Sequence, residues 1–209
     1  IELPFGDVQR SIEYIGNVAS DIVNDGKMTV FIGGEHIISL PIIREYYKLY
    51  GDDLKIIQFD AHADLRYDYL GNKFSHACVM RRIAEFINPS NIFQVGIRSG
   101  TEEELDFGSK NTNMYLHEII EGIEKAVDAV KRYPTYITID IDVVDPAHAP
   151  GTGTPEPAGC TSAELFKALI KCKDLNLKGV DLVEVSPPFD VSDNTSILAA
   201  KLLREIILF

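Results

Sequence analysis

The sequence lacks several features that mark whole classes of protein. Its 209 residues include no tryptophan and only three cysteines, Cys78, Cys160 and Cys172, which lie far apart and form no C-x-x-C pair. Neither a disulfide framework nor a thiolate zinc site is indicated, and unpaired thiols fit a reducing, cytoplasmic location. No apolar run approaches the roughly 18 residues of a membrane span, and no basic-then-apolar leader is present, so we expect no membrane partner.

Positive charge is also scarce. Lysine and arginine number 20 against 32 aspartates and glutamates, for a formal net charge of −12. This balance disfavours nucleic acid as a partner and is compatible with a cationic small-molecule substrate. The Gly- and Pro-rich stretch at residues 146–159 contains neither a Gly-Lys-Ser/Thr signature nor G-x-G-x-x-G, so we interpret it as a rigid rim, with His148 as a candidate rim contact.

What the chain does contain is an alternation of short apolar runs and amphipathic stretches. Its length suits one domain covering residues 1–209. Period-2 or continuous apolar runs predict strands at residues 28–32, 55–59, 92–97, 113–116, 136–139 and 180–185. Helical spacing predicts helices at residues 7–24, 40–50, 75–86, 119–131, 161–172 and 192–208. The alternation predicts an α/β fold with a mainly parallel sheet.

Some polar residues of this framework are expected to be structural. Thr161 and Glu164 have the spacing of a helix capping box. The glutamates at positions 102–104 suit the solvated first turn of a helix, and we assign them no chemistry.

Metal-capable side chains follow the second predicted strand directly. The run LKIIQF ends in Asp60-Ala-His62-Ala-Asp64, where polar residues alternate with alanine. While the chain stays extended, these three side chains point to one side. In open α/β sheets the site lies beyond the carboxyl ends of the strands, where this cluster falls. The alternative is a helix N-cap with incidental polar neighbours.

The same arrangement recurs at other strand ends. His36 follows Gly33-Gly34-Glu35 after the first strand, and Glu184 lies near the end of the last. Asp140 and Asp142 follow the fifth strand and share a face by period two. His76 opens a predicted helix, where it can lie at the rim of the same pocket or face solvent.

Four aspartates brought together would repel one another, and burying them without cations would be costly. One divalent ion offsets half of that charge, so two ions within about 4 Å of each other suit the ligand set better. Carboxylate and imidazole ligands without sulfur favour a hard ion such as Mn²⁺, with zinc or iron left open.

The motifs together resemble one known family. They are GGEH at residues 33–36, DAHAD at 60–64, SHA at 75–77, DIDVVDPAHAPGTGTPEP at 140–157 and EVSP at 184–187. In this order they look like the ureohydrolase family of arginases and agmatinases, and the match runs along the whole chain. The resemblance implies a three-layer α/β/α sandwich and a homo-oligomer, a trimer or hexamer. It also implies a longer N-terminal segment, which this sequence lacks or does not show.

The resemblance further implies roles for the site residues. His36, Asp60, Asp64 and Asp140 would hold one Mn²⁺, and Asp60, His62, Asp140 and Asp142 the other. Glu184 would pair with the substrate guanidinium, His76 would shuttle a proton, and Asp64 would help move a proton to the leaving amine. Ala158 stands where the family usually has glycine, which affects only the loop shape.

The expected reaction is hydrolysis of agmatine to urea and putrescine. The loop after Asp64, LRYDYLGN, lacks the hydroxyl run with which arginases hold the α-carboxylate and α-amine, and its sequence resembles agmatinases. Arg66 in that loop leaves a guanidino acid such as guanidinobutyrate open as substrate. An arginase or formimidoylglutamase activity, a single-zinc deacetylase and a non-catalytic family member also stay open.

Overall fold

Six parallel strands form the centre of the protein in a computed structural model that describes residues 1–209. The sheet order is β1-β6-β5-β2-β3-β4, and every neighbouring pair is parallel. All six predicted strands are present, with ends shifted by up to a few residues: β1 (Thr29–Ile32), β2 (Lys55–Phe59), β3 (Ile92–Ile97), β4 (Asn113–Leu116), β5 (Thr135–Asp140) and β6 (Leu177–Val183).

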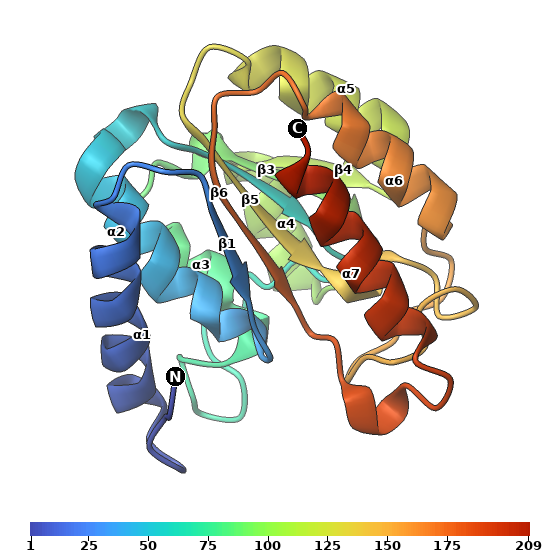
Figure 1. Cartoon of the computed structure of the whole chain (residues 1–209), viewed down its shortest axis with the longest axis horizontal. Coiled ribbons are helices and arrows are strands. Elements are labelled where there is room, and N and C mark those ends of the chain that lie inside the picture. Colours follow the sequence, from blue (N-terminus) through green and yellow to red (C-terminus); the bar gives the residue numbers. More distant parts are fainter.

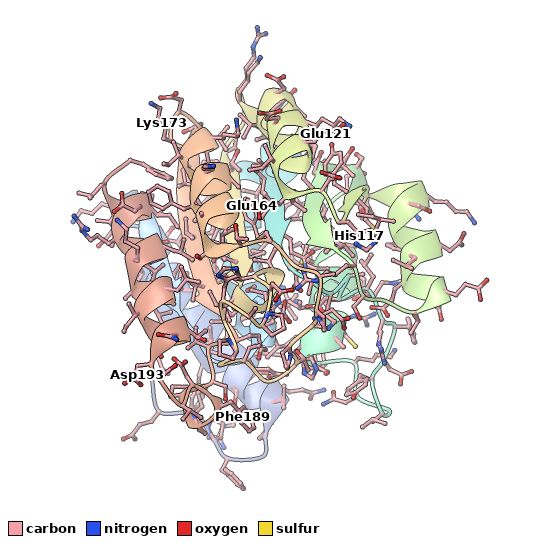
Figure 2. The ribbon with its side chains drawn as sticks, turned by 90° about the vertical axis from the view of Figure 1, so that its right-hand side faces the viewer. His117, Glu121, Glu164, Lys173, Phe189 and Asp193 are labelled. Atoms are coloured by element: carbon pink, nitrogen blue, oxygen red, sulfur yellow. The ribbon has the colours of Figure 1, made fainter.

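Helices cover both faces of this sheet, so the predicted three-layer sandwich is confirmed. One face carries α1 (Val8–Val23), α2 (Ser39–Tyr50), α3 (Val79–Ile83) and α4 (Glu102–Asn111). The other carries α5 (Ile119–Val130), α6 (Ser162–Lys171) and α7 (Asn194–Ile207), the helices seen from outside in Figure 2. Figure 1 shows the sheet between the two layers.

The strands are apolar on both sides because both sides are covered. Successive residues of β2 enter different cores: Ile56 packs with α1, α2 and α3, whereas Ile57 packs with α5, α6 and α7. Both are fully buried. Burying such a side chain contributes about 1.5–3 kcal/mol, so these two apolar clusters supply most of the driving force that holds the layers together.

Two predicted boundaries are wrong. The helix expected at residues 75–86 begins as a short 3-10 turn, His76–Cys78, and α3 ends at Ile83, where hydrogen bonds from Glu85 N to Arg82 O and from Phe86 N to Ile83 O form tighter turns. The last strand ends at Val183 rather than Val185, because Glu184 has a φ of 63° and leaves the extended conformation.

The order of the strands creates one crevice. From β2 the chain moves outward to β3 and β4, and from β5 it moves the opposite way to β6. The carboxyl ends of β2 and β5 therefore flank a topological switch point, where open α/β sheets place their ligands. Phe59 of β2 pairs with Ile139 of β5, so Asp60 and Asp140 leave the sheet side by side.

Candidate metal centre and active site

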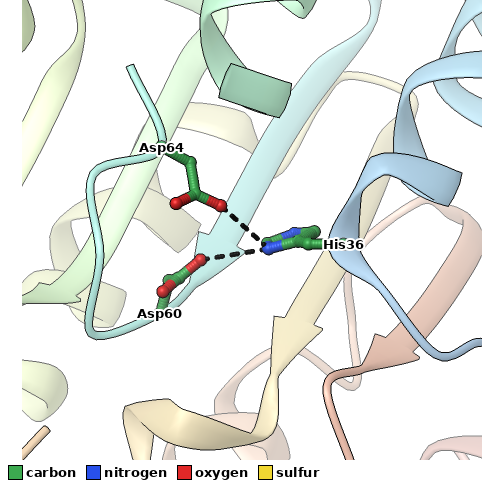
Figure 3. A group of neighbouring side chains, drawn as sticks. All are labelled: His36, Asp60 and Asp64. Carbon is green, nitrogen blue, oxygen red and sulfur yellow. Dashed lines mark ion pairs between the residues drawn. The ribbon is translucent and has the colours of Figure 1, made fainter. Parts of the chain in front are cut away.

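The most buried part of the site surrounds the imidazole of His36. Its Nδ1 lies 3.1 Å from an Asp64 oxygen and 3.3 Å from oxygens of both Asp60 and Asp140. The two glycines before Glu35 lead β1 into the short turn that carries this histidine, and Figure 3 shows the ring facing the carboxylates of Asp60 and Asp64. We call these four residues the inner group.

A second group lies beside the first and shares Asp60 with it. His62 Nδ1 is 2.8 Å from Asp142 Oδ2 and 3.7 Å from Asp60 Oδ1. The His62 side chain is 26 % exposed, whereas His36 is fully enclosed. We call Asp60, His62 and Asp142 the outer group, because its histidine is partly exposed and lines the cavity described below.

The structure brings together all six of the side chains proposed as metal ligands, but the period-two argument for their direction is only partly correct. Ala61 to Ala63 stay extended beside Ser99, whereas Asp64 has a φ of 54° and turns back toward His36. Asp142 lies in a 3-10 turn, Ile141–Val143, and its N–H donates to Asp140 Oδ1 at 2.9 Å. Asp140 is still in the strand, whereas a tight turn, and not an extended strand, aims the Asp142 carboxylate at the site.

Sequence reasoning missed the residues that orient His36. Its Nε2 lies 2.9 Å from Thr138 Oγ1, and the Thr138 hydroxyl donates to Asp181 Oδ1 at 2.6 Å. The Tyr136 hydroxyl donates to the other Asp181 oxygen at 2.8 Å. Because Thr138 gives its proton to Asp181, its oxygen accepts from Nε2–H, which leaves the His36 Nδ1 lone pair directed at the inner group.

A second buried set of hydrogen bonds orients Asp60. Gln58 Nε2 donates to Asp60 Oδ2 at 2.7 Å, and Gln94 Nε2 donates to Gln58 Oε1 at 2.7 Å. One signal in the sequence could have identified these partners: Gln58 and Thr138 each lie two residues before a site aspartate, as polar residues within an apolar strand.

Crowding of the carboxylates perturbs their protonation. Burial raises the pKa of Asp60 to about 7, and repulsion from Asp64 and Asp142 adds to the shift. Burial also raises the pKa of Asp140 well above its ordinary value. For His36, burial acts downward, but the carboxylates of Asp140, Asp60 and Asp64 raise its pKa well above the ordinary value.

These residues fit divalent metal ions. His36 Nδ1 is buried without a hydrogen-bond partner, and no lysine or arginine forms an ion pair with the site aspartates. The triads His36–Asp60–Asp64 and Asp60–His62–Asp142 each bring their ligand atoms within 4.8 Å of one another. A cation at each triad would offset both the burial of charged carboxylates and the repulsion between them.

A polar cavity of about 170 Å³ adjoins both groups, and its wall includes His62 of the outer group and Asp64 and Asp140 of the inner group. Glu184 lines it, and Glu184 Oε1 accepts a hydrogen bond of 2.7 Å from the backbone N–H of His36. Burial raises the pKa of the Glu184 carboxyl. Its positive φ, like that of Asp64, is a strained conformation of the kind found at functional sites.

His76 lies on the wall of the same cavity and is not a purely solvent-facing residue. Glu35 Oε1 accepts from the His76 backbone N–H at 2.8 Å and lies 3.3 Å from its ring Nδ1. The contact with Glu35 raises the pKa of the His76 imidazole. Tyr69 packs edge-on against the ring at 5.6 Å.

Two expectations about other polar residues are wrong. Glu104 is not solvated: it is 3 % exposed, and its carboxylate accepts from the N–H groups of Leu65 and Thr101 and pairs with Arg66. The capping-box spacing of Thr101 and Glu104 was the signal that this side chain folds back. His148 is exposed and does not line the cavity.

Comparisons with known proteins agree with this geometry. The sequence profile of the arginase family matches residues 1–209. An agmatinase from Bacillus subtilis (strain 168) is 45 % identical over 211 aligned positions, covering 100 % of this chain and 72 % of the relative. A guanidinobutyrase from Pseudomonas aeruginosa is 36 % identical, covering 89 % of this chain and 61 % of the relative.

A solved structure shows that the similarity extends to the fold. The crystal structure of a putative agmatinase from Clostridium difficile superposes with a TM-score of 0.95 at 39 % identity, covering 99 % of this chain and 76 % of that one. None of the helices here combines the length and the apolar content that crossing a bilayer requires. The family match over the full length, together with the two ligand triads, means that the chain belongs to the arginase family and is a ureohydrolase with a candidate binuclear divalent-metal site.

Proposed function

We propose that this protein hydrolyses agmatine to urea and putrescine. The observation that carries the proposal is an acid-lined cavity beside two ligand triads, in a chain that is 45 % identical to an agmatinase over its whole length. Among the carboxylates that line the cavity, Glu184 is neither assigned to a metal ion nor paired with an arginine, so it can pair with a cationic group of the substrate.

The proposed metal ions are two Mn²⁺. His36, Asp60, Asp64 and Asp140 would hold one, and Asp60, His62, Asp140 and Asp142 would hold the other; donors that are carboxylate and imidazole without sulfur support a hard ion. When bound, such ions activate water for attack on the guanidinium carbon and stabilise the charge that develops there.

Substrate binding is assigned to Glu184. A guanidinium presents its N–H groups in a planar fork, and the Glu184 carboxylate can accept them in charge-assisted hydrogen bonds. The His36 backbone N–H already holds one oxygen of this carboxylate, which fixes its direction within the cavity. Burial raises the pKa of Glu184, and a bound guanidinium acts against this shift because a nearby cation favours the ionised carboxylate.

Proton transfer is assigned to His76. Glu35 raises the pKa of the imidazole, so His76 can carry a proton near neutral pH and give it to the departing amine. Asp64, which lines the cavity and contacts His36, is a second candidate for moving that proton.

The test is urea release from agmatine, arginine and guanidinobutyrate. We expect kcat/KM for agmatine to exceed that for both others by at least about tenfold, because both competitors carry a carboxylate that agmatine lacks, and a carboxylate left unpaired in this site costs several kcal/mol. Guanidinobutyrate is the second candidate substrate, since Arg66 lines the cavity. A ratio below tenfold for either competitor contradicts the agmatine proposal.

Other expectations about the protein stay predictions. We expect metal analysis of the active enzyme to find two ions per chain. We also expect these ions to lie within about 4 Å of each other. The homo-oligomer implied by the family resemblance should appear in solution by light scattering. The free, largely buried thiols of Cys78 and Cys172 are consistent with the predicted cytoplasmic location.

A further inference from the structure

One ion pair in the cavity wall has been assigned no role in metal binding, guanidinium binding or proton transfer. Arg66 Nε lies 3.3 Å from Glu104 Oε2, and both residues line the cavity. The Arg66 side chain is 37 % exposed, whereas that of Glu104 is 4 % exposed. The arginine therefore faces the cavity, and the glutamate lies behind it.

The protein holds Glu104 rigidly in that position. Its Oε1 accepts from Leu65 N at 3.1 Å, and its Oε2 accepts from Thr101 N at 2.8 Å. The Arg66 guanidinium is held on its other side, where it lies 5.0 Å from the centre of the Tyr69 ring. Of the guanidinium nitrogens, only Nε makes a hydrogen bond, so the remaining N–H groups are available to the cavity.

The charge of the cavity wall at this point depends on both members of the pair. Arg66 alone would attract a carboxylate and repel an ammonium group. With Glu104 behind it, the pair has no net charge, so it neither repels an ammonium tail nor attracts a carboxylate tail as Arg66 alone would.

We propose that the Arg66–Glu104 pair is a specificity determinant for the charge at the tail of the substrate. Glu104 neutralises Arg66 and thereby admits an amine tail in preference to a carboxylate tail. This inference rests on the proposed function, because it explains how a cavity with an arginine in its wall serves agmatine.

The experiment changes the two members of the pair separately and together. Glu104→Gln gives the wall a net charge of about +1, and Arg66→Gln gives about −1. The measured quantity is the ratio of kcat/KM for agmatine to that for guanidinobutyrate. We expect Glu104→Gln to lower this ratio and Arg66→Gln to raise it, each by about tenfold, and the double variant to return it to within about threefold of the wild-type value.

The chain offers a matched control in Glu164→Gln. Glu164 forms the same capping box with Thr161 at the start of α6, but it has no arginine partner and lies outside the cavity (Figure 2). Losing a capping carboxylate there should leave the ratio unchanged. If Glu104→Gln only lowered the stability of the protein, both activities would fall together and their ratio would not change. Stability loss therefore does not explain shifts of the ratio in opposite directions in Glu104→Gln and Arg66→Gln.

The outcomes are distinct. Opposite shifts that cancel in the double variant support the inference, and if Glu104→Gln does not fold, a rise in Arg66→Gln supports it alone. Shifts in the same direction, or no shift in Arg66→Gln, overturn it while leaving agmatine hydrolysis intact. A wild-type protein that hydrolyses neither substrate overturns the proposed function and this inference with it.

Discussion

The inner and outer groups differ most in how firmly the protein holds them. His36, Asp60, Asp64 and Asp140 are at most 6 % exposed by side chain, and two buried hydrogen-bond chains support them. In the outer group His62 is 26 % exposed. Asp142 accepts from Ala61 N at 3.1 Å and, weakly, from Thr154 at 3.4 Å.

From this difference we infer that the two halves of one metal centre have separate tasks. The inner group is built as part of the core, so its geometry is set before any ion binds. In the outer group, His62 is partly exposed at the cavity, where substrate and solvent have access. We therefore expect the inner ion to bind more tightly and the outer ion to exchange faster, and the following experiments test that comparison.

Asp140→Ala should disrupt the inner and the outer group together, and it is therefore expected to have the largest effect. Asp140 contacts His36 and also accepts from the N–H of Asp142. We expect loss of both ions and at least about a 10³-fold fall in kcat, since metal ions supply several kcal/mol of transition-state stabilisation.

Metal content per chain and urea release measure this effect. Asp145→Ala is the control, because that carboxylate lies on the same loop but accepts from the backbone N–H groups of Ala147 and Gly159. Retention of both ions in Asp140→Ala would contradict the assignment.

His76→Ala should separate catalysis from metal binding. His76 lies on the cavity wall outside both groups, so both ions should stay bound while turnover slows by roughly 10²-fold or more. The control is His148→Ala, an exposed histidine outside the cavity, which should behave like wild type. If His76→Ala loses metal, the proton-shuttle role is wrong.

Asp181→Asn should sharpen the comparison by weakening only the inner group. It removes a carboxylate oxygen that accepts from Thr138 or Tyr136, and with it the constraint on the His36 tautomer. Partners of this kind contribute about 10- to 100-fold in metal affinity.

Calorimetric titration with Mn²⁺ should show the tighter step weakened and the other unchanged. Asp190→Asn provides a matched loss of a buried carboxylate, because Asp190 caps the start of α7 and not the metal centre. Equal weakening of both steps in Asp181→Asn would mean that the two halves are not separately supported.

Glu35→Gln should give the smallest effect, confined to a pH profile. Glu35 raises the pKa of His76, so removing its charge should lower that pKa toward the ordinary value. If protonated His76 serves the leaving amine, activity is lost as pH rises through its pKa, and the basic limb should move to lower pH. Proton NMR of His76 measures the same shift directly; an unmoved resonance would contradict it.

The sequence was sufficient to predict which strand ends carry the chemistry. Apolar runs stop at Asp60 and Asp140, and parallel strands must bring such ends to one edge of the sheet. It was not sufficient for the backbone at Asp64 and Asp142, because left-handed and 3-10 conformations depend on tertiary contacts that alternation does not encode.

The supporting residues were harder to find for a different reason. Asp181 looked like an ordinary position in an apolar strand, and its partner Thr138 lies 43 residues away in the chain. The pair meets only because β5 and β6 are neighbours, and local pattern does not contain that strand order. For Glu104 the capping-box spacing was a local signal that the side chain folds back, but its burial depends on contact with the loop that follows Asp64.

The contact between His36 N and Glu184 Oε1 joins residues that are 148 positions apart, and this has a consequence for the order of folding. A ribosome-bound chain that ends at Asp64 already carries DAHAD. It lacks Asp140 and Asp142 at the end of β5, and it lacks the Asp181 carboxylate in β6. Pairings between such distant segments form slowly and late. We therefore expect metal uptake to follow completion of the sheet, so that a bound ion reports a finished chain and does not start its folding.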